Sequence, residues 1–328
     1  MLRWCAAALY VASVVRASHG QDVITTVAGN GGTTFSGDGG LATAASLKYC
    51  NSVRALLNAS TGGVTLYIAD SENNRIRRVD EAGIITTVAG NGAIIFPGDG
   101  GAATAASLDF PQSVSPLVNP STGGVVLYIA DTDHQRIRRV NEAGIMATVA
   151  GTGTLGFSGD GGLATAAQLY NPFGTSVVYN PNTGGVTLYI ADRSNQRIRC
   201  VNEAGIISTV AGSDSATGFS GDGGAATAAR LSNPQGVATL FNSNTGGVTL
   251  YIADTGNNRI RRVTEAGTIT SVAGSSSTSG FGGDGGLATA ALLTAPTDVA
   301  LVSNATSGGV TLYITDRGNS RIRRVNET

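Results

Sequence analysis

One pair of segments recurs five times along the chain and constrains its fold more than any other feature. The first copy joins an apolar run that ends in aspartate, residues 66–70 (LYIAD), to a basic segment at residues 75–79 (RIRRV). The aspartates that close the five apolar runs are Asp70, Asp131, Asp192, Asp254 and Asp316, at steps of 61 or 62 residues. A fixed period of this size indicates repeats that bury their apolar faces by stacking on one another.

Composition narrows the class of protein. The chain is 41% hydrophobic and 13% charged, with 47 glycines, which is too apolar for a disordered chain and too rich in glycine for a helical one. Its 21 basic and 22 acidic residues nearly cancel. With a net charge near zero, the chain has no overall positive potential that would attract a polyanion. We therefore expect no nucleic-acid partner and no attraction to an anionic membrane.

The first twenty residues lie outside the repeats. A basic start at Arg3 precedes an apolar run at residues 4–15 and then small residues. This order predicts a secretory signal peptide at residues 1–20, cleaved after Ala17 or Gly20. The alternatives are a buried strand or helix, or a membrane anchor, but the run is too short to span a bilayer. We expect a secreted protein with no membrane span and one repeat domain at residues 21–328.

The cysteines predict no disulfide framework. Cys5 lies in the predicted signal peptide and would be removed with it. Cys50 occupies a position that is proline in the other repeats, and Cys200 one that is arginine in the other repeats. The last two belong to different repeats, so we expect unpaired thiols.

The third repeat is the most regular and predicts four short strands. Their ranges are 173–179, 186–191, 197–201 and 206–211. The turn at 180–185 contains paired glycines that allow a hairpin, and the run at 186–191 is apolar enough for a strand buried on both faces. Four antiparallel strands joined by tight turns describe one blade of a β-propeller.

The two ends of the chain predict how the blades close. The chain stops after the third strand of its last repeat, whereas residues 22–29 match residues 83–90, the fourth strand of the first repeat. The expected fold is therefore all-β: a β-propeller of five four-stranded antiparallel blades, with the ring closed by the N-terminal strand beside residues 321–325.

A glycine-rich connection of about twenty residues follows each fourth strand. In the third repeat it holds the motif GFSGDGG at residues 156–162 and an alanine-rich piece that predicts a turn or two of helix. We expect Phe157 and Leu169 to hold this connection on the body of the blade.

These motifs resemble the NHL repeat. The resemblance rests on YIAD, a short loop, asparagine or glutamine before RIR, and a strand of the form GxIxTVAG, and it covers residues 22–328. The GFSGDGG connection is similar to that of extracellular and bacterial members, including the NHL region of teneurins. The resemblance implies a β-propeller, commonly six-bladed, but no single activity, because the family includes adhesion modules, RNA-binding domains, scaffolds and a few enzymes.

The repeated aspartates admit a catalytic and a structural interpretation. As a ring they would supply metal ligands or general bases, but we expect each to pair with the arginine that opens the third strand, or to accept backbone N–H groups. The expected pairs are Asp70 with Arg75, Asp131 with Arg136, Asp192 with Arg197, Asp254 with Arg259, and Asp316 with Arg321.

The aspartates of the connections form a second set: Asp38, Asp99, Asp160, Asp222 and Asp284. Because two glycines and an alanine-rich turn follow each of them, we expect a helix cap or an Asx turn. Calcium is the alternative, but no repeat supplies alternating Asp and Asn ligands. No cofactor and no metal are expected.

The histidines and inner strands offer little for catalysis. His19 and His134 are too few for a three-histidine metal site, which excludes the chemistry of the peptide-amidating lyases that resemble NHL proteins. The inner strands begin with Asn51, Gln112, Phe173, Gln235 and Thr297, and Asp298 is the only carboxylate among the inner-strand positions from these residues onward. We expect a non-catalytic module that binds an extracellular protein or a glycan; the alternative is a propeller hydrolase or lactonase with a metal in the central channel.

The copies differ most in the loops after the second strand and in the residues just before the inner strand. We expect these loops to bind the partner, because variation on a rigid scaffold is typical of recognition surfaces, although neutral drift would give the same pattern. The candidate binding residues are Lys48, Tyr49, Asp109, Phe110, His134, Tyr170 and Arg193.

Three N-glycosylation sequons begin at Asn58, Asn304 and Asn326. Asn58 and Asn304 follow the first strand of their repeats, and Asn326 is expected in the turn after the third strand. These turns lie at one end of a blade, so we expect the glycans on the face opposite to the binding loops.

Overall fold

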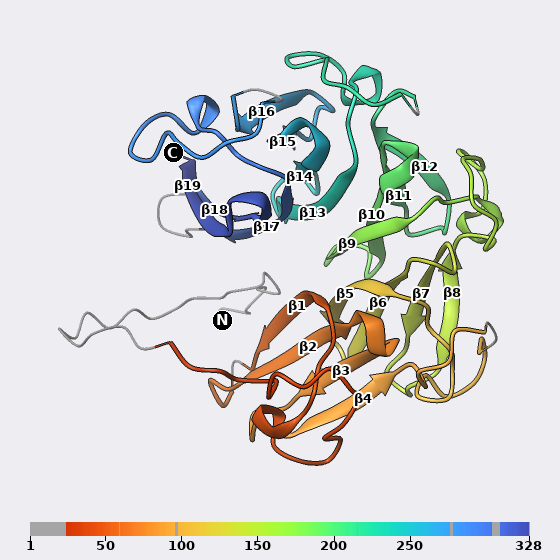
Figure 1. Ribbon diagram of the computed structural model, residues 1–328. Helices are drawn as coiled ribbons and strands as arrows, with labels where there is room; N and C mark the ends of the chain where they lie inside the picture. The colour runs from red at the N-terminus through yellow and green to blue at the C-terminus, as the bar shows by residue number, and fades with distance from the viewer. Residues whose placement is uncertain are drawn as a thin grey trace, which may run out of the picture. The chain divides into compact units, whose positions relative to one another are not determined.

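The computed structural model describes residues 24–58, 60–95, 98–214, 216–275, 278–303 and 309–327. Within this part of the chain, nineteen strands form five antiparallel sheets, and each sheet comes from one repeat (Figure 1). The predicted class, an all-β propeller of five blades, is confirmed. The expected signal peptide at residues 1–20 lies outside the described residues.

Each blade follows the chain order from its first strand to its last. The first blade holds β1 (Cys50–Leu57), β2 (Val64–Asp70), β3 (Arg75–Val79) and β4 (Ile85–Ala89). The second holds β5 (Pro111–Val118), β6 (Val125–Asp131), β7 (Arg136–Val140) and β8 (Met146–Ala150). The third holds β9 (Pro172–Tyr179), β10 (Val186–Asp192), β11 (Arg197–Val201) and β12 (Ile207–Ala211). The fourth holds β13 (Pro234–Phe241), β14 (Val248–Asp254), β15 (Arg259–Val263) and β16 (Ile269–Ala273), and the fifth holds β17 (Pro296–Ser303), β18 (Val310–Asp316) and β19 (Arg321–Glu327).

Short 3₁₀ helices occupy two kinds of loop. In the connections they are η1 (Ala42–Ala44), η3 (Ala164–Ala166), η5 (Ala226–Ala228) and η7 (Ala288–Ala290). After the second strands they are η2 (Ser71–Asn73), η4 (Arg193–Asn195), η6 (Thr255–Asn257) and η8 (Arg317–Asn319). The alanine-rich pieces thus form the single turn that their sequence predicts.

The described residues divide into two compact units. The N-terminal unit holds residues 24–127 and Arg139–Ala147, and the C-terminal unit holds Tyr128–Arg138 and Thr148–Thr328. The first blade therefore lies in the N-terminal unit, and the third, fourth and fifth blades lie in the C-terminal unit.

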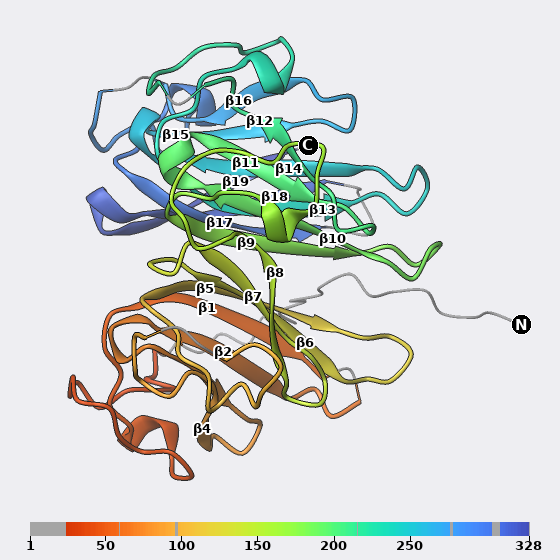
Figure 2. The same ribbon diagram turned by 90° about the vertical axis from the view of Figure 1, so that its right-hand side faces the viewer.

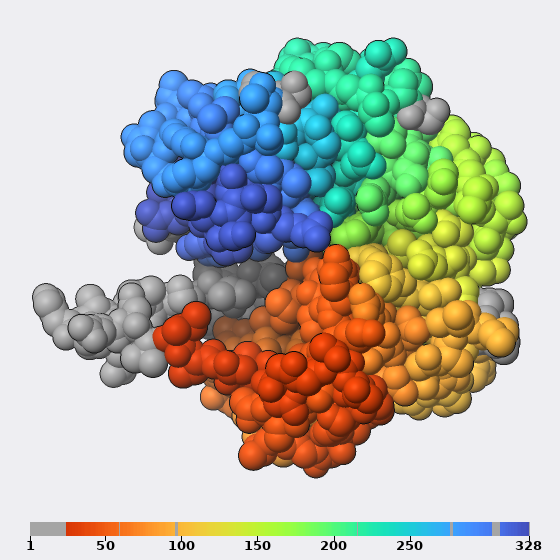
Figure 3. Space-filling view, in the orientation of Figure 1, coloured from red at the N-terminus to blue at the C-terminus, as the bar shows by residue number. Residues whose placement is uncertain are grey.

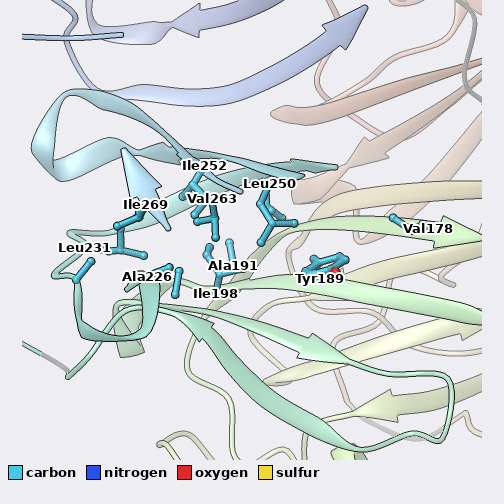
Figure 4. Packing of buried hydrophobic residues seen from close by; sticks show 13 residues of the cluster. Val178, Tyr189, Ala191, Ile198, Ala226, Leu231, Leu250, Ile252, Val263 and Ile269 are labelled. Carbon is cyan, nitrogen blue, oxygen red and sulfur yellow. The ribbon is translucent and has the colours of Figure 1, made fainter. Parts of the chain in front are cut away.

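The apolar core of the C-terminal unit lies between successive blades. Ile198 of the third blade and Ile252 and Ile269 of the fourth are fully buried in one cluster (Figure 4). A second cluster joins the fourth and fifth blades through residues such as Ile260 and Leu312. Burying one such side chain stabilises the fold by about 1.5–3 kcal/mol, which explains why the second strands are apolar on both faces.

Two glycines allow the inner strands of the C-terminal unit to approach closely. The strands β9, β13 and β17 are neighbours, and a Cβ on Gly174 would lie 2.3 Å from the backbone oxygen of Gln235. A Cβ on Gly236 would lie 2.7 Å from the Cα of Asp298. This approach is the physical reason for glycine at the third position of β9 and of β13.

Each blade has two ends with different loops. At one end, which we call the hairpin end, the turn after the first strand bonds the turn after the third, as in the 3.1 Å bond from Asn180 Nδ2 to Glu203 Oε1. At the other, the loop end, the loop after the second strand meets the residue before the first strand, as in the 2.8 Å bond from Tyr170 N to Asp192 Oδ1. Figure 2 shows hairpins of the C-terminal unit extending on one side.

The fifth blade departs from the expectation, because the structure gives it three strands. Residues 24–28, which were expected to supply its fourth strand, form no strand, and Ile24 is 98% exposed. Among the residues that the structure describes, β19 is the last strand of its sheet, and Ile322 is 66% exposed although its counterpart Ile76 is fully buried. Closure by the N-terminal strand stays a prediction.

The strand β19 is longer than the third strands of the other blades. The strand β19 extends to Glu327, so Asn326 lies in the strand and not in the expected turn. The Glu327 carboxylate accepts a hydrogen bond from the Tyr251 hydroxyl and lies 3.6 Å from Arg262 Nη1.

Candidate functional site

A buried arginine and a buried aspartate form the most regular polar contact of the blades. The arginine is the middle one of the third strand, seven residues after the aspartate, and the nitrogen–oxygen distances are 3.1–3.4 Å. The pairs are Asp70 with Arg77, Asp131 with Arg138, Asp192 with Arg199, Asp254 with Arg261, and Asp316 with Arg323. The expected pairing with the arginine five residues on is wrong.

The first arginine of the third strand stacks on a phenylalanine instead. The Arg197 guanidinium lies 3.8 Å from the centre of the Phe157 ring and donates to the carbonyl oxygens of Asn195 and Ser213 at 2.9 and 3.1 Å. The same stacking occurs between Arg75 and Phe35, Arg259 and Phe219, and Arg321 and Phe281. Phe157 thus holds the connection on the blade, as its position predicts.

The aspartates of the connections also bond the middle arginine. Asp160 Oδ1 lies 2.6 Å from Arg199 Nη2, and the equivalent distances for Asp38, Asp222 and Asp284 are 2.5–2.7 Å. The expected helix cap is wrong for these aspartates, because the 3₁₀ helix begins after Leu163 and has no side-chain cap. A buried guanidinium between two carboxylates satisfies its charge, which explains the fixed spacing of the three segments.

His134 belongs to this structural contact and not to a binding surface. Its ring is 9% exposed, and Nδ1 lies 3.0 Å from both carboxylate oxygens of Asp131. Asparagines hold the same place in the other blades: Asn73, Asn195, Asn257 and Asn319 donate to their aspartates at 2.8–2.9 Å. The expectation that His134 binds a partner is therefore wrong, because its ring replaces a buried asparagine.

Burial changes the protonation of two of the aspartates. Burial raises the pKa of Asp192 and of Asp254 to about 6. Hydrogen bonds from backbone and asparagine N–H groups, and the charge of the paired arginine, lower the pKa but do not offset the effect of burial. Neither carboxylate is accessible to a substrate, since both side chains are fully buried. The raised pKa therefore results from burial in the blade and does not mark these aspartates as general bases.

At the loop end of the N-terminal unit, the structure brings together two of the predicted binding residues. The rings of Tyr49 and Phe110 lie 6.0 Å apart between centroids at an interplanar angle of 27°. Lys48, which precedes Tyr49 in the sequence, has its Nζ 2.9 Å from Glu72 Oε2. Asp109 is half-buried. Glu72 was not among the predicted binding residues, because its contact with Lys48 joins two loops that are 24 residues apart in the sequence.

Two other predicted residues lie at the loop end of the third blade. Tyr170 is 37% exposed, and the Arg193 guanidinium lies 5.7 Å from the centre of the Phe173 ring. Burial, and next the charge of Arg317, lower the pKa of Arg193. Phe173 was considered only as the start of an inner strand, so its stacking on Arg193 was not predicted.

The connection before the first blade lies at the surface. Residues 24–47, coloured red in Figure 3, include Leu41, whose side chain is 59% exposed. Within the described residues, no group of three or more histidine, cysteine or carboxylate side chains is arranged to hold a metal ion.

The sequons have different surroundings. Asn58 is exposed at the hairpin end, where its side chain donates to Glu81 at 2.8 Å, as Asn119, Asn180 and Asn242 do to their glutamates. The Asn326 side chain accepts a hydrogen bond from Thr311 at 3.2 Å. Asn304 lies outside the described residues. Glycosylation at these positions stays a prediction.

The chain has relatives among teneurins. It is 28% identical to teneurin-1 of Mus musculus over 300 residues, a match that spans 80% of this chain and 10% of teneurin-1. The chain is thus similar to about a tenth of that relative. No protein-family model matches the chain.

Solved structures share the fold. An auxiliary nutrient binding protein from Bacteroides thetaiotaomicron superposes with a TM-score of 0.57 at 17% identity, covering 87% of this chain and 60% of that one. A putative phosphatase from the same species gives 0.51 at 15% identity, covering 88% and 74%.

The repeated blades define a β-propeller. The chain is thus similar in sequence to part of the teneurins and similar in fold to the solved propeller structures. Within the described residues, no helix has both the length and the apolar character needed to cross a bilayer.

Proposed function

We propose that this chain is a secreted, non-catalytic β-propeller that binds an extracellular macromolecule through the loop ends of its blades. One contrast carries the proposal. The repeated charges are buried against each other, as in the pair of Asp192 and Arg199, whereas Tyr49, Lys48 and Tyr170 are exposed and differ from blade to blade. A rigid repeated scaffold with variable exposed loops is what recognition needs.

The partner is an extracellular protein or a glycan. Aromatic side chains beside charged ones are common anchors in both kinds of interface, and the loop end offers Tyr49 and Phe110 beside Lys48 and Glu72. Export follows from the signal peptide predicted at residues 1–20, and residues 58, 304 and 326 are the proposed glycosylation sites at the hairpin end.

The second candidate function is that of a propeller hydrolase or lactonase with a metal in its central channel. The reason to consider this candidate is the structural similarity to a putative phosphatase, although an identity of 15% shows the fold alone. Against it, the repeated carboxylates are engaged by arginines, and Asp298 Oδ1 accepts the N–H of Val299 at 3.0 Å. A metal at the repeated carboxylates would have to replace the buried arginines.

Affinity capture tests the proposed function. The mature chain, residues 21–328, is immobilised and incubated with the extracellular fraction of its source, and the retained material is identified by mass spectrometry and by glycan analysis. We expect saturable retention of one component that binds the soluble chain in a second, purified assay. Metal analysis of the same preparation checks the alternative: a stoichiometric bound ion with no retained component would contradict the proposal.

A further inference from the structure

The first residue of the loop after each second strand has a structural role in three of the five blades. There it is a buried serine or threonine, and its hydroxyl donates to the carbonyl oxygen of the proline that opens the next blade, at 2.6–2.7 Å. The pairs are Ser71 with Pro111, Thr132 with Pro172, and Thr255 with Pro296. In the third and fifth blades this residue is an arginine, Arg193 and Arg317. These two blades therefore have no hydroxyl at a position where it joins neighbouring blades elsewhere in the fold.

The Arg193 side chain gains no polar partner in exchange. The residue is half-buried, and its guanidinium donates no hydrogen bond and forms no ion pair to any residue that the structure describes. Its contact is with the Phe173 ring, whose centre lies 5.7 Å away. A guanidinium carries five N–H donors, and partly buried donors without an acceptor are costly. The exchange of a bonded hydroxyl for this arginine is thus unfavourable for the scaffold alone.

The two arginines lie close enough for their charges to act on each other. Burial, and next the charge of Arg317, lower the pKa of Arg193. Burial and the charge of Arg199 lower the pKa of Arg197 as well, but there the carboxylate of Asp192 acts in the opposite direction. Two like charges that a rigid scaffold brings together favour an anion between them.

The fourth blade leaves room for such an anion. Its inner strand, β13, lies beside both β9 of the third blade and β17 of the fifth, so the arginine loops η4 and η8 lie on its two sides. The loop of the fourth blade itself, η6, has the sequence Thr255, Gly256 and Asn257, which carries no charge and no long side chain.

We propose that Arg193 and Arg317 form a binding site for an oxyanion with two negative charges, such as phosphate or sulfate, at the loop end of the C-terminal unit. Guanidinium groups bond the oxygen atoms of such anions in pairs, and two positive charges balance two negative ones. The Phe173 ring lies against Arg193 and limits the orientations of its guanidinium. The inference rests on the proposed function for its place, because it names the chemistry of one group that the same loop end binds.

Isothermal titration calorimetry with sodium sulfate and with sodium phosphate tests the site. The titrations are made at pH 8, where both anions carry two charges, with sodium chloride added to keep the ionic strength constant. We expect saturable binding of at least one dianion, and binding of sodium acetate that is weaker by about tenfold or more, since acetate carries one charge.

The substitution Arg193→Thr gives the third blade the residue that the second and fourth blades use. We expect it to weaken dianion binding by about tenfold or more, and to melt no lower than the parent, because its hydroxyl can bond the Pro234 carbonyl. Arg317→Thr, at an exposed position, should weaken binding by a similar factor. The matched control is Arg230→Thr, which removes one positive charge from the same unit, at an arginine about half exposed and 3.6 Å from Asp214, and should leave binding unchanged.

Three results would overturn the site: no saturable binding of either dianion by the parent chain, parent-like binding by Arg193→Thr, or an equal loss of binding in Arg230→Thr. Affinity capture separates this inference from the proposed function. If the parent chain binds neither dianion but still retains a component, the oxyanion site fails and the proposed function holds. If it binds a dianion through Arg193 but retains no component, the site holds and the proposed function fails.

Discussion

Arg199 and Asp192 form a salt bridge in which Nη1 and Oδ2 lie 3.2 Å apart and both side chains are fully buried. The second nitrogen of the same guanidinium lies 2.6 Å from Asp160. One arginine therefore joins the second strand, the third strand and the connection of its blade. Because an unpaired buried charge is costly, we expect the blade to depend on all three side chains.

The substitution Arg199→Met tests this dependence. Removing the guanidinium leaves Asp192 buried without its cation, and we expect the free energy of unfolding to fall by about 3–5 kcal/mol in urea titrations. The control is Arg230→Met, which removes an arginine about half exposed, 3.6 Å from Asp214, and should change stability by about 0.5 kcal/mol or less. Equal stability of the two variants would contradict the account of the buried pair.

The sequence predicts the strands to within about one residue but not the partner of each aspartate. Arg197 and Arg199 are two residues apart on one strand, so they lie on the same face and their spacing favours neither as the partner. The choice depends on Phe157, which stacks on Arg197 and arrives from a connection about forty residues earlier. Only the folded chain shows that contact.

The stability of the fold should depend on pH in two opposite ways. The pKa of Asp192 and of Asp254 is raised from the usual 3.8 to about 6 by burial, so their contribution to stability is fully present below pH 3.8 and is lost as pH rises through 6. Hydrogen bonds from threonine and asparagine lower the pKa of the exposed Glu81, Glu142 and Glu265 below 4.5, so their contribution is present above pH 4.5 and is lost as pH falls through their folded pKa.

The contribution of the two buried aspartates to the pH dependence of stability can be measured separately from that of the exposed glutamates. We expect the free energy of unfolding in urea to be equal or higher at pH 5.5 than at pH 7.5, and carbon-13 NMR to give carboxyl titration midpoints near 6 for Asp192 and Asp254. Midpoints near 4 for both carboxyl groups, with stability falling from pH 7.5 to 5.5, would show that burial does not control their protonation.

The left-handed position before the fifth blade offers a simple gain in stability. Ala295 has φ of 44°, where asparagine is tolerated better than alanine. We expect Ala295→Asn to raise the free energy of unfolding by about 0.5–1 kcal/mol, and Asn233→Ala to lower it by about the same amount. If the two exchanges shift the urea midpoint in the same direction, the backbone argument fails.

The open edge of β19 keeps the expected closing strand testable. Ile322 is 66% exposed where its counterparts in the other blades are buried, and residues 22–29 carry the sequence of a fourth strand. We expect deletion of residues 22–29 to lower the melting temperature and to promote aggregation through the edge of β19. The control is Ile322→Thr in the full chain, which should lower stability if the edge is covered in solution and should leave it unchanged if the edge stays exposed.

The candidate site was only partly predictable. The sequence identified Tyr49 and Phe110 as exposed and variable, and the structure brings their rings together. It misplaced His134, although the asparagines at the same position of the other four repeats are a signal of a structural role. The left-handed backbone under the two rings could not be predicted, because a single aromatic residue before a strand does not specify φ.

The measurement that tests the central claim most directly compares the two ends of the blades. Alanine at Tyr49, Phe110 and Tyr170 together changes the loop end, and alanine at Thr61, Thr122 and Thr183 changes the hairpin end, where these hydroxyls donate to glutamates. The dissociation constant of each variant for the captured partner is measured by surface plasmon resonance, with far-ultraviolet circular dichroism as the check on folding. We expect the loop-end variant to lose binding at least a hundredfold and the hairpin-end variant to bind like the parent; the reverse order would contradict the assignment of the binding face.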